Sequence, residues 1–474
     1  INGPFFSTRD RLPVKMVPRS DISIWSILRH CIGKELSRIT IPVHFNEPLS
    51  FLQRISENLE YAELLDKADK CADPVQRMEY VATFAVASLS YNLNRLFKPF
   101  NPLLGETFEL INEKLDFRLI AEQVSHHPPI SATHTETPNW VFSTSVQPKL
   151  RFWGKFVEIK PEGLLTLKML NYNESYTWRS VNSCVHNIII GQLWFEQYGN
   201  MEIINHANGL RAVLNFKPAG WFGKDLHRVE GFILSRDNVK LRFIYGKWTD
   251  YLKSADVEDY NEYMKNNENR FRIPDQVDTD EGKKSPSSGN SSPTSRKMFS
   301  KFSSIKKSLT GSSSSLDIPD ASNGNLPPPL EYSDGIPKSD SSHSLDIPNS
   351  KVLWRVNQRP EYSADYYHFT LNTMSLNEFR EGMKKYLPPT DCRLRPDVRA
   401  LEEGDLEKAA NLKHLLEEKQ RETRKMRKKR KEEWHPMWFK RGKNTCTNED
   451  DWIFTGKYWE RNYSDCPNIF DISI

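Results

Sequence analysis

The chain has 474 residues, 38% of them hydrophobic, and a formal net charge of +4 at pH 7. It is several times longer than a domain needs to bury a stable core, and no run approaches the roughly 18 consecutive apolar residues of a membrane-spanning helix, so a small stapled scaffold and a helical membrane protein are excluded. Seven positive charges fall within residues 424–431 (RKMRKKRK), which leaves the rest of the chain at −3, so its basic character is local. Six scattered cysteines without a CxxC pair favour the reducing cytosol over a disulfide framework.

The first predicted element is an amphipathic segment over residues 22–39. Apolar side chains recur four residues apart with polar ones between them, and Pro42 ends the pattern. A second helix is predicted to begin with Asp73 as N-cap and Pro74 as its first residue, and to be buried as far as Leu89. The apolar positions of the first segment are Ile24, Trp25, Leu28, Ile32 and Leu36.

Residues 108–248 change to short alternating runs, such as KLRFWGKFVEI and RAVLNF, separated by turn residues. About ten strands in succession predict a large antiparallel meander or barrel. Farther on, 14 of the 31 residues 285–315 are serine, a composition that cannot bury enough apolar surface to offset its ordering entropy. Residues 277–349 are therefore predicted to be a disordered insertion.

Beyond this insertion the chain again shows the patterns of regular structure. Strands are predicted at residues 351–356 and 367–371, a helix at 375–385 and a long charged helix at 405–433. The same core resumes there, so the insertion interrupts one domain rather than separating two.

The most distinctive string is EQVSHHPPIS, which contains His126 and His127. Neighbouring residues on a strand point to opposite faces, so both histidines can serve one ligand only if the strand breaks, and Pro128 and Pro129 predict that break. Two adjacent imidazoles at a strand end can donate hydrogen bonds to a phosphate. A structural role is the commoner fate of such a pair, whereas a metal site is disfavoured because no third ligand lies at a recognisable spacing.

Two further segments carry candidate binding residues with an ordinary alternative beside each. In FKPFNPLLGE, Lys98 and Asn101 could hold a phosphate and a polar headgroup, or the segment could be a rigid connector with a solvated lysine. On the late helix Lys413, Glu417 and Arg421 recur every four residues and share one stripe. On pattern alone, this stripe is equally an i, i+4 salt-bridge ladder.

Together these segments resemble a known family. EQVSHHPP is similar to the fingerprint of the oxysterol-binding protein-related family of lipid-transfer proteins, and FKPFNPLLGE, RLRPDVRALEEGDLEKAA and KHLLEEKQR look like three further family blocks in the expected order. The likeness covers about residues 20–276 and 350–460. The segment FNEPLSFLQR is most similar to the short or sterol-directed members.

The resemblance implies an α+β fold, in which a large incomplete antiparallel β-barrel encloses an apolar tunnel, with flanking helices and an N-terminal lid. It implies a single lipid-binding domain over residues 20–460. Within it we expect a lid at about 20–46, a helical part at 47–106, the barrel at 107–276 and 350–371, a C-terminal helical part at 375–460 and the disordered insertion at 277–349.

The resemblance also implies ligands and roles. Lys98, His126 and His127 would hold the phosphate of phosphatidylinositol 4-phosphate. From the late helix, Lys413 and Arg421 would contact the headgroup with Glu417 beside them, and Asn101 would add a polar contact. The amphipathic segment, with Ile24, Trp25, Leu28, Ile32 and Leu36, would be the lid that closes over a sterol or over acyl chains. Neither a cofactor nor a metal is implied.

The basic octet 424–431 is followed by Trp434, Trp438 and Phe439. A nuclear-localisation or nucleic-acid patch and a solvated helix end are the alternatives, but the lipid interpretation favours an anionic membrane surface and no nucleic acid, because basic residues and interfacial tryptophan suit a headgroup layer. A receptor of the endoplasmic reticulum is a further possible partner of the family. Its motif is missing or degenerate here, because Phe5 and Phe6 lack acidic neighbours.

The sequence therefore predicts a non-enzymatic, cytoplasmic lipid carrier, peripherally associated with membranes at organelle contact sites, which exchanges a sterol for phosphatidylinositol 4-phosphate. A lipid sensor that signals through partners is the main alternative. A hydrolase with His126 or His127 as general base is the third, but the chain has neither a nucleophile elbow nor a paired carboxylate motif.

Overall fold

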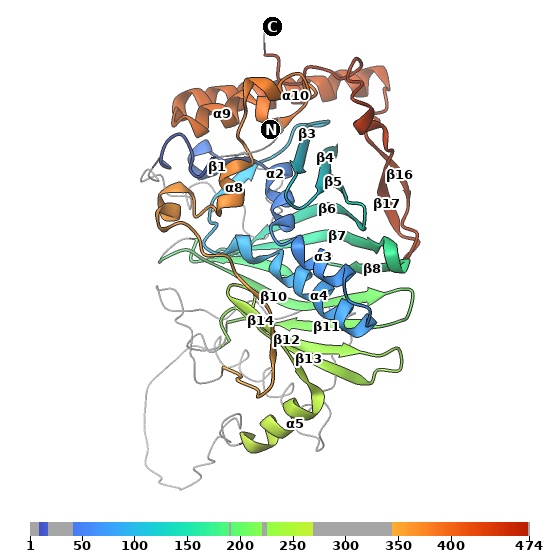
Figure 1. Cartoon of the computed structure of the whole chain (residues 1–474). Helices are drawn as coiled ribbons and strands as arrows, with labels where there is room; N and C mark the ends of the chain where they lie inside the picture. The colour runs from blue at the N-terminus through green and yellow to red at the C-terminus, as the bar shows by residue number, and fades with distance from the viewer. Residues whose placement is uncertain (1–8, 18–40, 189–190, 220–224, 269–343, 473–474) are drawn as a thin grey trace, which may run out of the picture. The chain divides into compact units, whose positions relative to one another are not determined.

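The computed structural model describes residues 9–17, 41–188, 191–219, 225–268 and 344–472 (Figure 1). Apart from residues 267–268, these belong to one compact unit, formed by Ile1–Asn266 and Pro329–Ile474. The predicted amphipathic lid segment at 22–39 and residues 277–343 of the predicted insertion at 277–349 lie outside the described residues.

In the described part of the chain, thirteen strands form one sheet in which every neighbouring pair is antiparallel. The order is β15-β14-β13-β12-β11-β10-β8-β7-β6-β5-β4-β3, with β9 paired to both β10 and β7. This confirms the predicted α+β fold with a large, nearly closed antiparallel sheet. The strands are β3 (Thr107–Asn112), β4 (Phe117–His126), β5 (Pro129–Glu136), β6 (Trp140–Phe152), β7 (Val157–Met169), β8 (Glu174–Trp178), β9 (Asn182–His186), β10 (Trp194–Asn205), β11 (Arg211–Phe216), β12 (Arg228–Leu234), β13 (Lys240–Lys247), β14 (Tyr251–Asp256) and β15 (Lys351–Arg355).

The alternation of side chains along the strands explains how one face of the sheet becomes a core. In β11 every second residue is buried, and the side chains of Ala212, Leu214 and Phe216 are fully covered. This is the period expected of a strand with one face against the interior.

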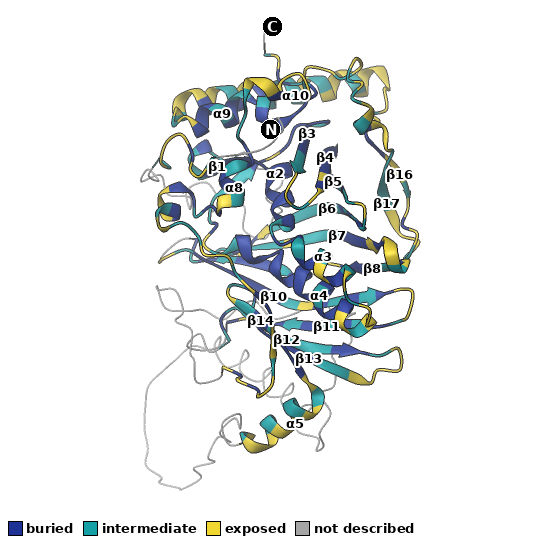
Figure 2. Ribbon diagram, viewed as in Figure 1, coloured by how far each residue is buried: buried dark blue, intermediate teal, exposed yellow. Residues whose placement is uncertain are grey.

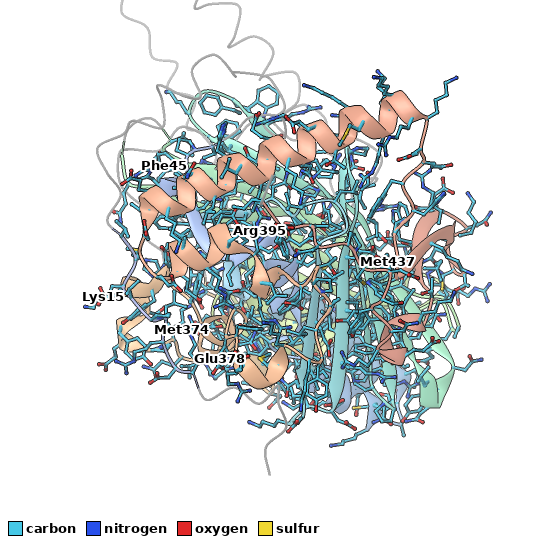
Figure 3. All side chains as sticks on the ribbon, turned by 90° about the horizontal axis from the view of Figure 1, so that it is seen from above. Lys15, Phe45, Met374, Glu378, Arg395 and Met437 are labelled. Atoms are coloured by element: carbon cyan, nitrogen blue, oxygen red, sulfur yellow. The ribbon has the colours of Figure 1, made fainter. Side chains whose placement is uncertain are left out.

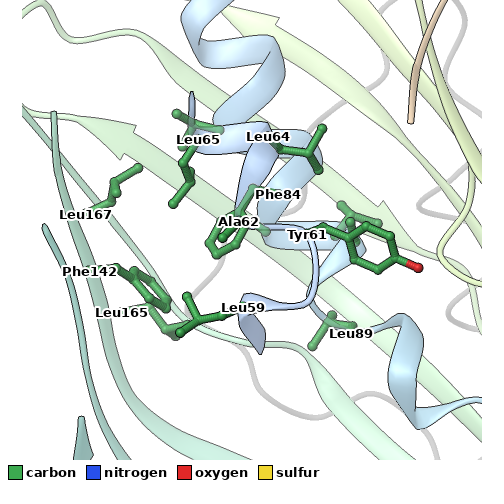
Figure 4. Packing of buried hydrophobic residues seen from close by; sticks show 14 of the residues in the cluster. Leu59, Tyr61, Ala62, Leu64, Leu65, Phe84, Leu89, Phe142, Leu165 and Leu167 are labelled. Atoms are coloured by element: carbon green, nitrogen blue, oxygen red, sulfur yellow. The ribbon is translucent and has the colours of Figure 1, made fainter. Parts of the chain in front are cut away.

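The segment before β3 packs the main helices onto the sheet. It contains β1 (Asn46–Ser50), α2 (Phe51–Ser56), α3 (Glu63–Asp69), α4 (Pro74–Ala87) and β2 (Lys98–Phe100), which pairs in parallel with β1. Helix α4 begins as predicted, because the Asp73 side chain accepts a hydrogen bond from the Val75 N–H at 3.0 Å. Its Phe84 meets Phe142 of β6 edge to face at 5.4 Å, within the packed cluster of Figure 4.

The C-terminal elements cover one end of this unit. They are α9 (Pro396–Glu402), α10 (Leu406–Arg430) and the hairpin β16 (Phe439–Lys443) and β17 (Asp450–Phe454), while the short helix α5 (Val257–Asn266) follows β14. The long charged helix was predicted at nearly these bounds, and Asp405 caps it by accepting from the Lys408 N–H. Most of α10 is exposed, except for the buried Ala409, Lys413 and Leu416 (Figure 2).

Two predicted elements are wrong. No strand forms at 367–371, because Tyr367 and His368 adopt positive φ angles of 57° and 56° after the 3-10 turn Glu361–Tyr366. The predicted helix at 375–385 is replaced by α8 (Leu371–Ser375) and the turn Glu381–Met383.

Tertiary hydrogen bonds explain the early end of α8. The Leu376 carbonyl accepts from the Gln53 side chain at 3.2 Å, and the Asn377 carbonyl accepts from Arg399. Both carbonyls are therefore used outside a continuing helix.

Residues 344–349, which the sequence assigns to the insertion, are described and in contact with the unit. Leu345 and Ile347 are buried, and the Ile347 N–H donates to the Tyr245 hydroxyl at 3.3 Å. The chain thus packs onto the sheet several residues before β15.

Candidate functional site

A cavity of about 1100 Å³ lies between the ends of β2 and β4 and the helix α10. The seven predicted headgroup residues all line it, although they come from three separate stretches of the chain. They are Lys98 on β2, Asn101 just after it, His126 and His127 at the end of β4, and Lys413, Glu417 and Arg421 on α10. Figure 3 looks onto this end, where α10 crosses the unit, with Arg395 labelled beside it and Met437 on the segment that follows the helix.

Lys98 is positioned by the parallel pair of β1 and β2. The side chain of Asn46 donates to the carbonyls of Lys98 and Pro99 at 3.0 and 3.3 Å. Burial lowers the pKa of Lys98 to about 8, and repulsion from Lys413 adds to this, while Glu417 acts in the opposite direction. Lys98 is therefore a cation at neutral pH that has little counter-charge of its own.

His126 and His127 occupy the predicted break between two strands. Strand β4 ends at His126 and β5 begins at Pro129, and the two imidazole rings meet edge to face at 4.8 Å. Burial, followed by the charge of His127, lowers the pKa of His126 to about 4. His126 is therefore neutral at pH 7.

Of the salt-bridge ladder that the stripe on α10 could form, only the pair of Lys413 and Glu417 is present. Lys413 Nζ lies 2.7 Å from Glu417 Oε1 and donates to the Ile41 carbonyl at 3.2 Å. Arg421 pairs with Glu418 instead of Glu417, so the salt-bridge ladder stops after one rung. The Lys413 side chain is largely buried, whereas Arg421 is half exposed at the cavity.

Several cavity residues were missed in the sequence. Arg395 and Gln420 lie within the family-like blocks RLRPDVR and KHLLEEKQR, and Arg424 follows Arg421 by three residues, so helical spacing could have found it. Of the β16 residues, Phe439 had been noted only as an aromatic residue after the basic octet, and no sequence signal pointed to Lys440 or Arg441. The further lining residues include Arg395, Gln420, Arg424, Arg427, Trp434, Lys440 and Arg441.

Trp434, which lines this cavity, packs closely against Gly105. Gly105 has a φ of +81°, and a Cβ built on it would lie 2.8 Å from the Trp434 ring. Arg427 stacks over the same ring at 4.8 Å from its centroid. The glycine of FKPFNPLLGE therefore lets an aromatic ring from beyond α10 pack directly on the loop that follows β2.

A second cavity, of about 350 Å³, adjoins the first and runs along the inner face of the sheet. Ile41, Lys98 and Asn101 line both cavities, so the two spaces meet at these residues. The second cavity is mainly apolar. Its lining includes Phe45, Phe51, Ile55, Leu89, Leu96, Phe97, Val146, Leu150, Val157, Ile159, Leu165, Trp178, Val185, Ile188, Leu193, Phe195 and Met201.

The predicted lid residues Ile24, Trp25, Leu28, Ile32 and Leu36 lie outside the described residues. Among the residues that the structure describes, no group of three or more His, Cys, Asp or Glu side chains could hold a metal ion. In the same ranges, no helix combines the length and the hydropathy needed to cross a bilayer.

A family model described as oxysterol-binding protein matches residues 23–463. The chain is 48% identical to rat oxysterol-binding protein-related protein 1 and 47% identical to mouse oxysterol-binding protein-related protein 2. Both comparisons cover 98% of the present chain. It spans 44% of the first relative and 88% of the second.

Two solved structures share the fold. The Osh1 ORD domain in complex with cholesterol has a TM-score of 0.74 and 32% identity, covering 98% of this chain and 94% of that one. The Osh3 ORD in complex with PI(4)P from Saccharomyces cerevisiae has a TM-score of 0.69 and 31% identity, covering 98% and 99%.

Proposed function

The chain belongs to the oxysterol-binding protein-related family of lipid-binding proteins, which are not enzymes, and from this premise we propose that it carries a sterol or phosphatidylinositol 4-phosphate in one tunnel and exchanges them between membranes. Domains of similar structure hold cholesterol in one case and PI(4)P in another. We further propose that the chain acts in the cytoplasm, peripherally on membranes and at organelle contact sites.

The observation that carries this proposal is the meeting of two unlike cavities at Lys98. A phosphoinositide has hydrocarbon chains and a multiply charged headgroup, and each methylene hidden from water contributes about 0.8 kcal/mol. The apolar cavity suits the hydrocarbon, while the cationic cavity suits the phosphates. In this assignment Lys98, His126, His127, Lys413 and Arg421 hold the headgroup, with Asn101 and Glu417 adding polar contacts.

Competition follows from the single apolar space. A sterol and two acyl chains cannot occupy it together, so loading one lipid releases the other. A phosphoinositide gradient between two membranes would then drive sterol transport. The segment around Ile24, Trp25, Leu28, Ile32 and Leu36 is the proposed lid that opens on a membrane and closes in water.

We propose that the basic end of α10 faces an anionic membrane. Residues 424–431 lie beside the cationic cavity, and Met426 is 51% exposed on the same helix. Lys and Arg near a membrane surface contribute about 1 kcal/mol each, which would hold the cavity opening at the headgroup layer.

Lipid extraction tests the proposal. Purified protein is mixed with liposomes that contain labelled sterol or labelled phosphatidylinositol 4-phosphate, the liposomes are pelleted, and the soluble lipid is counted. We expect wild type to extract both lipids, and His126→Ala with His127→Ala to extract sterol but at least tenfold less phosphoinositide. If wild type leaves both lipids in the pellet, the carrier proposal fails.

The alternative is a lipid sensor that signals through partners. Deleting residues 277–343 distinguishes a carrier from a sensor. The deletion ends at residue 343 because Leu345 and Ile347 are buried against the described unit. A carrier keeps its transfer rate without this segment, whereas a sensor that uses the segment as its output loses function in cells while still extracting lipid.

A further inference from the structure

One hydrogen bond in the cationic cavity sets the tautomer of the neutral His126 ring. The Leu104 N–H donates to Gln420 Oε1 at 2.8 Å, and since a backbone N–H can only donate, this bond fixes which end of the Gln420 amide is the oxygen. The Gln420 NH₂ group then faces His126 Nε2 at 2.8 Å. His126 Nε2 must accept, so the neutral ring carries its proton on Nδ1.

The two ring nitrogens of His126 differ in their partners. Nδ1 is buried and makes no hydrogen bond within the described residues, although the Pro102 carbonyl is close enough to raise the pKa. Nε2 is the nitrogen on the side of α10, where Gln420 and the ring both line the cavity. A phosphate, whose oxygens accept, therefore reaches His126 through Nε2, which in the empty site has no proton to give.

We propose that Gln420 holds the empty site in a state in which His126 cannot donate, and that a phosphomonoester headgroup binds by displacing the Gln420 amide from His126 Nε2, where one proton is then taken up from solvent. The ring changes from a neutral Nδ1–H imidazole to an imidazolium with a proton on each nitrogen, and no covalent bond changes. Gln420 is thus a positioning residue rather than a headgroup ligand. This inference rests on the proposed phosphoinositide function for its ligand, but not for the tautomer.

The charges around His126 explain why the empty site is neutral. Burial and the adjacent His127 are the main causes, and Arg395 and Arg424 act in the same direction. Arg395 and Arg424 are positively charged and His127 can become so. A phosphate dianion bound among these three side chains would make the electrostatic potential at His126 negative and so favour its protonation. At pH 7 the phosphate is mostly a dianion, since its second pKa is about 6, so the proton comes from the buffer.

Nitrogen NMR of histidine-labelled full-length protein at pH 7 tests the first half without lipid. We expect His126 of wild type to be the neutral Nδ1–H tautomer. Gln420→Leu should release this preference, and Gln420→Glu, which keeps an acceptor for the Leu104 N–H but offers His126 Nε2 a carboxylate, should give the imidazolium. Glu422→Gln, an exposed change on the same helix, should leave the signals as in wild type. An Nε2–H tautomer in the empty wild type would overturn the inference.

Adding a water-soluble short-chain phosphatidylinositol 4-phosphate tests the second half. We expect both His126 nitrogens to become protonated, and calorimetry in two buffers of different ionisation enthalpy to show that His126 takes up about one proton from the buffer. Gln420→Leu should bind about two- to tenfold more tightly, the equivalent of one net hydrogen bond. If Gln420 only stabilised the structure of the site, Gln420→Leu would bind the phosphoinositide more weakly than wild type. Binding to wild type with His126 still neutral would refute this inference alone, whereas no binding to wild type would refute the proposed function.

Discussion

At the scale of single residues, Lys98 makes the cationic cavity sensitive to alkaline pH. Its pKa is lowered to about 8 in the empty site, and a bound phosphate would raise it. Below pH 8 the lysine is charged with or without ligand, so it adds no pH dependence. Above pH 8 the Lys98 amine is mostly neutral in the empty site and must take up a proton when the phosphoinositide binds. The affinity for phosphoinositide should therefore fall by up to about tenfold per pH unit.

Titrating phosphoinositide binding from pH 7 to 10 in wild type and Lys98→Arg measures this effect. Arginine stays charged throughout the range, so above pH 8 the variant should lose the share of the decline that Lys98 causes and keep only the share from the His126 proton, whatever its affinity at pH 7. An identical decline in both proteins would show that Lys98 is not the titrating group.

The residue scale also shows what a sequence can and cannot reveal about a site. Lys98, His126 and Lys413 were singled out by their strings and spacing, the family resemblance gave them their headgroup roles, and the structure brings them to one cavity. Arg395 and Gln420 were missed because their positions depend on partners far away in the chain. Arg395 bonds to the Asn101 carbonyl and to Glu106, and Gln420 bonds to Leu104 and His126.

At the scale of elements, helix α4 illustrates a start that sequence chemistry determines. The Asp73 carboxylate accepts the Val75 N–H, and Pro74 occupies the first turn. Asp73→Ala should lower the free energy of unfolding by about 0.5–2 kcal/mol, measured by urea titration, because an unsatisfied helix N–H is left behind. Asp73→Asn should stay within a few tenths of a kcal/mol of wild type. Equal losses in the two variants would mean that the cap contributes nothing through its acceptor.

Elements fixed by distant contacts were less predictable. The long helix α10 and the strands followed their local periodicity, since each buries one face or carries its own cap. The predicted helix at 375–385 had a helical pattern too, but Gln53 and Arg399 bind the carbonyls of Leu376 and Asn377. Tertiary hydrogen bonds therefore override the local helical preference of this segment. Gln53 and Arg399 lie outside the segment itself, so its own sequence does not reveal them.

At the scale of the whole described unit, the proposed function depends on the two cavities sharing residues 41, 98 and 101. The thirteen-stranded sheet supplies the apolar walls, while the elements at its end supply the charge. The approximate number of strands and their antiparallel order were predictable from alternation, although the strand predicted at 367–371 does not form and β14 was not predicted. The enclosed space was expected only through the family resemblance. Periodicity shows which face of a strand is apolar, but not whether that face meets side chains or an empty chamber.

The most direct test of this account is a displacement measurement on the purified protein. A fluorescent sterol is loaded first, liposomes with phosphatidylinositol 4-phosphate are added, and the sterol that leaves and the phosphoinositide that enters are counted together. We predict that wild type releases one sterol for each phosphoinositide gained, and that His126→Ala with His127→Ala keeps its sterol. A wild-type protein that holds both lipids at once would contradict the single shared chamber.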